Sequence, residues 1–99
     1  ISKNNYVKLK KGMIVSNEPG YYLENKFGIR IENLVYIDGN KKNLYFKNLT
    51  YVPLEKDLVD ETLLSKAEKD YIFKYNLETY SRISPYLNEK EKSWLAKLL

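Results

Sequence analysis

The sequence contains no cysteine and no histidine. Without cysteine the chain forms no disulfide, and it offers neither a thiolate nucleophile nor a cysteine-ligated zinc site. Without histidine it cannot by itself supply a Ser-His-Asp triad, an imidazole general base or a histidine-ligated metal. Any hydrolytic chemistry in these residues must therefore use carboxylates, or histidines from chain that is not in this sequence.

Long hydrophobic runs are also missing, since none approaches the roughly 18–20 apolar residues of a membrane-spanning helix. We therefore expect no membrane partner. Arginine occurs only at Arg30 and Arg82, and scattered lysines carry most of the net charge of +4. The ten tyrosines make nucleic-acid binding an alternative to consider. Scattered lysines are more typical of a solvated surface, so we predict no nucleic-acid partner.

What is present is typical of a globular protein, with 43% apolar and 30% charged residues in a chain of 99. A chain of this length is one small domain or part of a larger one. It begins at Ile1 and not at a methionine, so we interpret it as a segment of a longer polypeptide.

The first half of the chain has the pattern of short strands and turns. We expect a strand over residues 13–17 and the strongest strand over residues 28–37, paired antiparallel through a loop over residues 19–27. A turn at residues 38–40 leads to further short strands at 43–47 and 49–52. Pro53 ends this region.

The second half has the pattern of helices. Ser65 and Glu68 form a capping box, which predicts a helix over residues 66–83. Pro85 disfavours a helical conformation at Ser84 and marks the boundary. Asn88 with Glu91 forms a weaker second cap, before a short final helix. Its apolar stripe consists of Trp94, Leu95, Leu98 and Leu99. The predicted fold class is α+β, with antiparallel strands followed by helices.

Two glutamates stand where the predicted strands meet. Alternation along a strand places Arg30 and Glu32 on one face and the neighbouring isoleucines on the other. From periodicity alone, an exposed Arg–Glu pair on a half-buried sheet is the simpler interpretation. Glu18, at the end of the adjacent strand, adds a second carboxylate that would converge on Glu32.

Two converging carboxylates repel each other unless one is protonated or a cation lies between them. A divalent metal ion removes that cost, and ligands that are all oxygen favour hard ions such as Mn²⁺ or Mg²⁺. Two carboxylates do not complete a metal site, so the residues themselves predict only half of one.

Residues 12–22 (GMIVSNEPGYY) and 27–33 (FGIRIEN) resemble the last two metal-ligand segments of the aminopeptidase P family. Residues 49–54 (LTYVPL) and the helical tail that ends near Trp94-Leu95 are similar to that family's C-terminal extension. The resemblance implies part of a pita-bread fold, with residues 1–53 belonging to the metallopeptidase domain and residues 54–99 forming a helical extension.

The resemblance also implies roles for four residues. Glu18 matches a glutamate that binds one metal ion and takes part in catalysis, and Glu32 matches the glutamate that bridges two metal ions. Tyr22 and Arg30 match residues just outside the ligands, which hydrogen-bond to and pair with a metal-binding aspartate. The family's other ligands, two aspartates and one histidine, would lie upstream of Ile1.

The implied function is that of an Xaa-Pro aminopeptidase, a metal-dependent exopeptidase that releases the N-terminal residue from peptides with proline in second position. Its implied cofactors are two divalent metal ions, and the expected metal is Mn²⁺. The implied enzyme is cytoplasmic, and this chain alone is expected to be inactive without the upstream polypeptide. The apolar stripe of the tail helices either packs on the rest of the protein or forms a subunit interface, and we expect a homodimer through it. Two alternatives remain open: a non-catalytic pita-bread domain that binds proteins such as histones, and the related peptidase prolidase.

Overall fold

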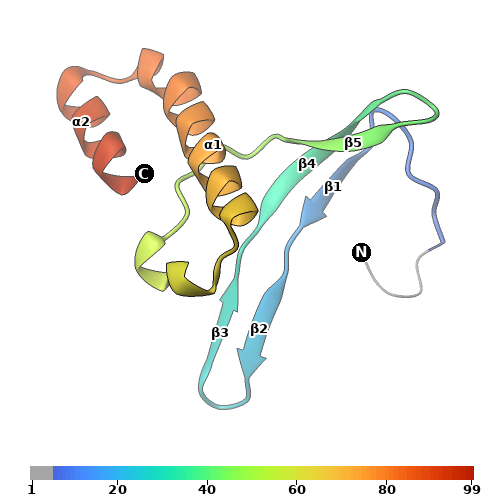
Figure 1. Cartoon of the computed structure of the whole chain (residues 1–99), viewed down its shortest axis with the longest axis horizontal. Coiled ribbons are helices and arrows are strands. Elements are labelled where there is room, and N and C mark those ends of the chain that lie inside the picture. The colour runs from blue at the N-terminus through green and yellow to red at the C-terminus, as the bar shows by residue number, and fades with distance from the viewer. Residues whose placement is uncertain (1–5) are drawn as a thin grey trace. The chain divides into compact units, whose positions relative to one another are not determined.

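The computed structural model describes residues 6–99 of the chain, which divide into two compact units. The first unit ends at Thr50, and the second covers Tyr51–Leu99. The first unit is built from strands and the second from helices (Figure 1). The predicted fold class, antiparallel strands followed by helices, is confirmed.

The first unit contains two antiparallel sheets. Three strands, β1 (Ile14–Asn17), β4 (Asn33–Gly39) and β5 (Leu44–Asn48), form one sheet in the order β1-β4-β5. The other two, β2 (Gly20–Leu23) and β3 (Phe27–Arg30), form a hairpin. Among residues 6–50, the buried apolar residues are Val35 and Ile37 on β4, as expected for alternate positions on the central strand of a sheet.

The segment that we predicted as a loop over residues 19–27 is mostly the β2–β3 hairpin, so this prediction was wrong. Asn25 at the hairpin turn has a φ of 57°, a left-handed conformation that asparagine tolerates. The N–H of Lys26 donates to the carbonyl of Leu23 at 3.1 Å and closes the turn. The predicted long strand over residues 28–37 is accordingly divided into β3 and β4.

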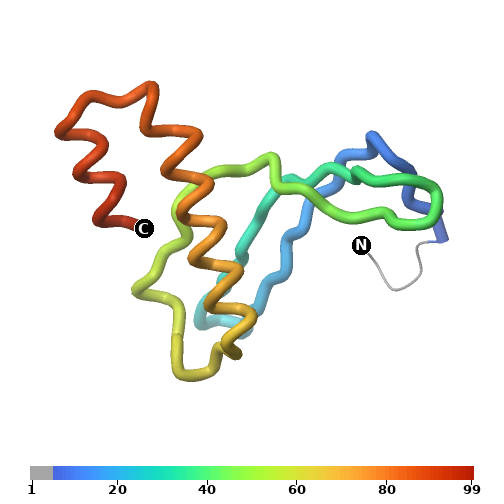
Figure 2. The backbone as a smooth tube through the Cα atoms, turned by 45° about the horizontal axis from the view of Figure 1, so that its top comes forward, coloured from blue at the N-terminus to red at the C-terminus, as the bar shows by residue number. Residues whose placement is uncertain are grey.

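The second unit contains helix α1 (Lys66–Ile83) and helix α2 (Glu89–Leu98), with 3₁₀ turns η1 (Lys56–Leu58), η2 (Glu61–Leu63) and η3 (Ser84–Tyr86). Both predicted caps are confirmed as complete capping boxes, at Ser65 with Glu68 and at Asn88 with Glu91. The predicted bounds of α1 are confirmed as well. In Figures 1 and 2 the two helices run side by side in opposite directions.

Two local predictions in this region were wrong. Ser84 precedes Pro85 and yet has a helical conformation, with φ −55° and ψ −31°, because α1 passes directly into the 3₁₀ turn η3. No strand forms over residues 49–52. Both backbone groups of Val52 bond instead to the buried hydroxyl of Tyr75, which accepts from the N–H at 3.2 Å and donates to the carbonyl at 2.9 Å.

The core of the second unit lies between the helices and the segment that precedes them. Tyr75 and Thr79 on α1 and Leu95 on α2 are buried, whereas Trp94 is 63% exposed. The predicted apolar stripe on α2 is therefore only partly turned inward. No helix among residues 6–99 is both long enough and apolar enough to span a bilayer.

Candidate functional site

The two glutamates lie where the β1–β4 ladder passes into the β2–β3 hairpin. Asn17 is paired with Asn33 on one side of this junction, and Gly20 is paired with Arg30 on the other. Both pairs have the same register, and Glu18 follows Asn17 while Glu32 precedes Asn33. The register therefore places Glu18 opposite Glu32. The two connecting segments run side by side in Figure 1.

The ladder is interrupted at this junction by Pro19, which has no N–H to donate. One hydrogen bond still crosses it, from the N–H of Ile31 to the carbonyl of Pro19 at 3.1 Å. That bond holds the two segments in the register of the flanking strands. Cross-strand partners share a face of a sheet, so Glu18 and Glu32 project on the same side.

Glu18 is held by hydrogen bonds to both of its carboxylate oxygens. The hydroxyl of Ser16 donates to Oε1 at 2.6 Å, and Nη1 of Arg30 lies 3.0 Å from Oε2. Ser16 stands two positions before Glu18 and therefore shares its face. We assigned no role to Ser16 from the sequence, although the same two-residue spacing that linked Arg30 to Glu32 would have indicated it.

Arg30 connects Glu18 to Tyr22. Its Nε–H donates to the hydroxyl of Tyr22 at 2.8 Å, and its guanidinium carbon lies 5.9 Å from the centre of the Tyr22 ring. The hydrogen bond to Tyr22 raises the pKa of Arg30, and the negative charges of Glu18 and Glu32 raise it further. The guanidinium is therefore a fixed positive charge beside the two carboxylates.

Three of the four residues singled out from the sequence are thus linked by direct contacts, since Arg30 bonds to both Glu18 and Tyr22. The fourth, Glu32, is brought opposite Glu18 by the register and acts on Arg30 through its charge. All four lie on the polar face of the first unit. The opposite face carries apolar residues at the alternate positions, among them Tyr21, Ile29 and Ile31.

The chemistry of this group fits part of a site for a hard metal ion, because it offers carboxylate oxygens already oriented by a hydroxyl and a guanidinium. Among residues 6–99, no cluster of three or more histidine, cysteine, aspartate or glutamate side chains is placed to hold a metal ion. The carboxylates of the described residues therefore do not complete a metal site by themselves.

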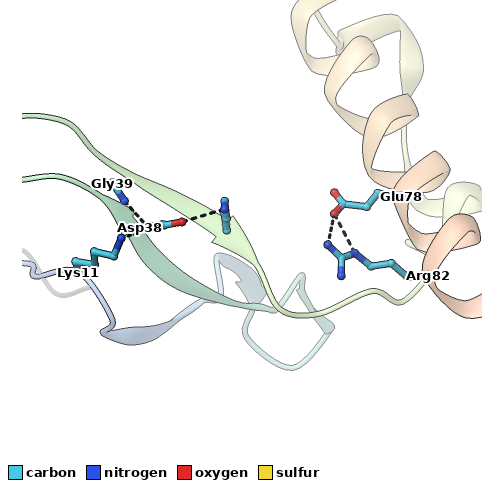
Figure 3. Close-up of polar contacts among 6 residues, drawn as sticks. Lys11, Asp38, Gly39, Glu78 and Arg82 are labelled. Carbon is cyan, nitrogen blue, oxygen red and sulfur yellow. Dashed lines mark hydrogen bonds and ion pairs between the residues drawn. The ribbon is translucent and has the colours of Figure 1, made fainter.

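A second polar cluster stabilises the three-stranded sheet at the end away from the two glutamates. Asp38 on β4 lies 2.9 Å from the Nζ atoms of both Lys11 and Lys47 and accepts from the N–H of Gly39 at 2.8 Å. Figure 3 shows Lys11, Asp38 and Gly39 converging. These hydrogen bonds, from Lys11 above all, hold the pKa of Asp38 far below its ordinary value. This cluster joins the turn before β1 to the β4–β5 hairpin.

An ion pair in the second unit also stabilises the packing of one segment on another. Arg82 donates from Nε and Nη2 to one oxygen of Glu78 at 3.0 and 2.8 Å, as Figure 3 shows. The guanidinium of Arg82 also lies 4.5 Å from the centre of the Tyr51 ring. These contacts attach the segment before η1 to helix α1.

Comparison with known proteins adds the family context. Residues 1–39 match the model of a protein family described as "Metallopeptidase family M24". Residues 42–98 match a second family model, described as "C-terminal region of peptidase_M24". The chain is 43% identical to a probable Xaa-Pro aminopeptidase P of Laccaria bicolor, over 94% of this chain and 16% of that protein. It is 41% identical to aminopeptidase P2 of Arabidopsis thaliana, over 92% of this chain and 14% of that protein.

A solved structure is also similar. X-prolyl aminopeptidase from Caenorhabditis elegans, described as a cytosolic enzyme with a di-nuclear active site, matches with a TM-score of 0.85 and 28% identity. The match covers 98% of this chain and 17% of that one. It confirms that the strands and helices seen here are part of a pita-bread fold.

The chain spans only 14–16% of the length of the two sequence relatives. The similarity nevertheless runs through both units of the chain, from the strands that carry Glu18 and Glu32 to the capped helices. The chain therefore belongs to metallopeptidase family M24 and includes the C-terminal region of that family.

Proposed function

We propose that this chain supplies part of the active site of a dinuclear metallo-exopeptidase that removes the N-terminal residue from peptides with proline in second position. The observation that carries the proposal is the placement of Glu18 opposite Glu32 on a polar face, with Arg30 beside them. The names of the relatives, Xaa-Pro aminopeptidases among them, support the same reaction.

In this proposal the carboxylates of Glu18 and Glu32 would hold the metal ions. When bound, two divalent ions would supply Lewis-acid polarisation of the scissile carbonyl and an activated water. Ser16 and Arg30 hold the carboxylate of Glu18 in one orientation. Glu18 also helps to accept the proton that the attacking water loses as the tetrahedral intermediate forms. Tyr22 positions Arg30. Mn²⁺ is our choice of metal, because all of the ligands on this chain are oxygens.

The other parts of the site come from the polypeptide that precedes these residues in the relatives. We assign residues 1–53 to the metallopeptidase domain and residues 54–99 to a helical extension. The division of the described structure at Thr50 supports a boundary close to Pro53. A cytoplasmic location is supported by the description of the similar structure as a cytosolic enzyme.

A homodimer is proposed through the helical extension. Phe73 and Leu77 on α1 are 67% and 60% exposed, and Trp94 on α2 is 63% exposed. Phe73 and Leu77 stand four positions apart and therefore share one face of α1, and large apolar side chains exposed on one face are typical of a surface that binds another protein. Sedimentation of the full-length protein should give the mass of a dimer, and truncation after Pro53 should give a monomer. A truncated dimer would place the contact elsewhere.

The activity is tested with Glu18→Gln and Glu32→Gln in the full-length protein. Both variants should lose Mn²⁺-dependent cleavage of an Arg-Pro-Pro peptide and should retain less metal, because a neutral amide is a poorer ligand than a carboxylate. Glu24→Gln, in the β2–β3 turn, is the matched control and should cleave as the wild type does.

Undiminished turnover by Glu32→Gln would reject the assignment. A wild-type protein that neither binds Mn²⁺ nor cleaves would instead fit a binding module. Cleavage of Xaa-Pro dipeptides in preference to longer peptides would indicate prolidase activity.

A further inference from the structure

The ring of Tyr22 lies flat across two glycines of the β2–β3 hairpin. A Cβ atom on Gly20 would be 2.6 Å from the Tyr22 hydroxyl oxygen, and a Cβ atom on Gly28 would be 2.5 Å from Cδ1 of the same ring. Both distances are well below an ordinary van der Waals contact of about 3.5–4.0 Å. Gly28 therefore lies under the inner end of the ring, and Gly20 lies under its hydroxyl end.

These two glycines are not required by backbone conformation. Among the described residues, the glycines with positive φ are Gly12 at 86° and Gly39 at 113°. Gly20 and Gly28 stand inside strands, where glycine weakens the sheet and often marks a close approach by another group. What these positions require is the absence of a side chain.

The register explains how both glycines come to lie under one ring. Gly28 is the cross-strand partner of Tyr22, and Gly20 is the cross-strand partner of Arg30. The ring extends from the first pair towards the second. Its hydroxyl reaches the Nε–H of Arg30 at 2.8 Å, while Nη1 of Arg30 lies 3.0 Å from Glu18. The flat ring therefore fixes the guanidinium that orients a proposed metal ligand.

We propose that Gly20 and Gly28 are positioning residues of the active site, because their bare backbone allows Tyr22 to lie flat and hold Arg30 against Glu18. The inference rests on the proposed metal site. A methyl group at either position would lift the ring, which is the free end of a side chain and can swing away. The swing would break the hydrogen bond to Arg30 and leave the strands in place.

The test is a double-mutant cycle in the full-length protein, with Mn²⁺ affinity measured by titration calorimetry. Gly20→Ala, Gly28→Ala and Tyr22→Ala should each weaken Mn²⁺ binding about tenfold, the lower end of the usual effect of residues that orient metal ligands. Gly28→Ala combined with Tyr22→Ala should be no weaker than Tyr22→Ala alone, since no ring is left to displace.

A matched control uses the other face of the same strand. Tyr21 neighbours Tyr22 but points away from the glycines. The effect of Gly28→Ala should be unchanged in a Tyr21→Ala background, because the two side chains do not meet. Wild-type Mn²⁺ affinity in both glycine variants would overturn the proposal, as would an undiminished effect of Gly28→Ala after removal of the Tyr22 ring.

Melting temperatures of the same set of variants test the proposal even where a variant folds too poorly for its Mn²⁺ affinity to be measured. If Gly28→Ala lowers the melting temperature through the ring, Tyr22→Ala restores it; if the loss persists, the backbone and not the ring needs glycine. A different result would show that the proposed metal site itself is wrong. In that case Glu18→Gln and Glu32→Gln would leave Mn²⁺ binding unchanged, whereas the coupling between Gly28 and Tyr22 in the melting temperature would remain.

Discussion

Arg30 and Glu18 stand twelve positions apart in the sequence and form an ion pair of 3.0 Å, from Nη1 to Oε2. They meet because the hairpin folds β3 back along β2, which brings the end of β3 beside the start of β2. The same guanidinium donates from Nε to Tyr22. One planar group thus makes two directed contacts, which an ammonium group does not reproduce.

Arg30→Lys should therefore impair the site although it keeps the charge. We expect a loss of Mn²⁺ affinity of about tenfold or more, as is usual when a residue that orients a metal ligand is changed. The free energy of unfolding should change by less than about 1 kcal/mol, because the pair is exposed to solvent. Titration calorimetry and thermal unfolding of the full-length protein measure the two quantities.

Arg82→Lys is the matched control, since Arg82 pairs with Glu78 and lies over Tyr51 in the helical unit. It makes the same chemical change away from the two glutamates and should leave Mn²⁺ affinity as in the wild type. Equal losses in the two variants, or none in Arg30→Lys, would contradict the role given to Arg30.

Local and non-local features of this fold differed in how well the sequence predicted them. Both capping boxes and the bounds of α1 were predicted, because a cap depends on residues three positions apart. The β2–β3 hairpin was missed, since the Pro-Gly after Glu18 suggested a loop and the turn depends on the left-handed conformation of Asn25. The strand at 49–52 was wrong because a distant side chain, Tyr75, takes the backbone bonds of Val52.

In the candidate site, too, local features were predicted from the sequence and non-local contacts were not. Alternation within one strand predicted that Arg30 and Glu32 share a face, and the motif indicated that Glu18 lies near. The contact between Arg30 and Glu18 depends on the exact register across the junction, which no residue pattern specifies. The two glycines under Tyr22 stood inside the recognised motifs, but their role depends on where the ring lies.

Asp38→Asn should destabilise the protein in a manner that depends on pH. Because Lys11 and Lys47 depress the pKa of Asp38 in the folded state, its stabilising effect is fully present above the unfolded pKa of about 3.9. The effect is lost as pH falls through the lower pKa of the folded state. Melting temperatures of wild type and variant should therefore differ by a constant amount down to about pH 4 and begin to converge only as the pH falls further.

Asp70→Asn is the comparison for that experiment. Asp70 pairs with Lys66 on the exposed surface of α1, where a single ion pair contributes little, about 0.3–0.5 kcal/mol. The variant should melt close to the wild type at every pH. A difference between wild type and Asp38→Asn that stayed constant from pH 7 to pH 3 would show that the carboxylate charge is not what stabilises the sheet end.

Ser65→Ala removes the N-cap of α1. The hydroxyl of Ser65 accepts from the N–H of Glu68, and the Glu68 side chain accepts from the N–H of Ser65. Loss of such a cap costs about 1 kcal/mol of unfolding free energy, to be measured by denaturant titration. Ser81→Ala, inside the same helix, should be neutral or slightly stabilising because alanine has the higher helix propensity. Equal effects of the two changes would argue against the cap.

The 99-residue chain by itself should show no peptidase activity. The proposed site draws two carboxylates from this chain, and among residues 6–99 no group of three or more histidine, cysteine, aspartate or glutamate side chains is placed to hold a metal ion. The chain's hairpin also leaves the large apolar side chains of Tyr21, Phe27 and Ile29 exposed, as expected for a surface that another part of the protein covers. The chain should therefore melt at a lower temperature and less cooperatively than the full-length protein. Mn²⁺-dependent cleavage of an Arg-Pro-Pro peptide by the isolated chain would mean that two glutamates suffice for catalysis, contrary to the half-site derived from its residues.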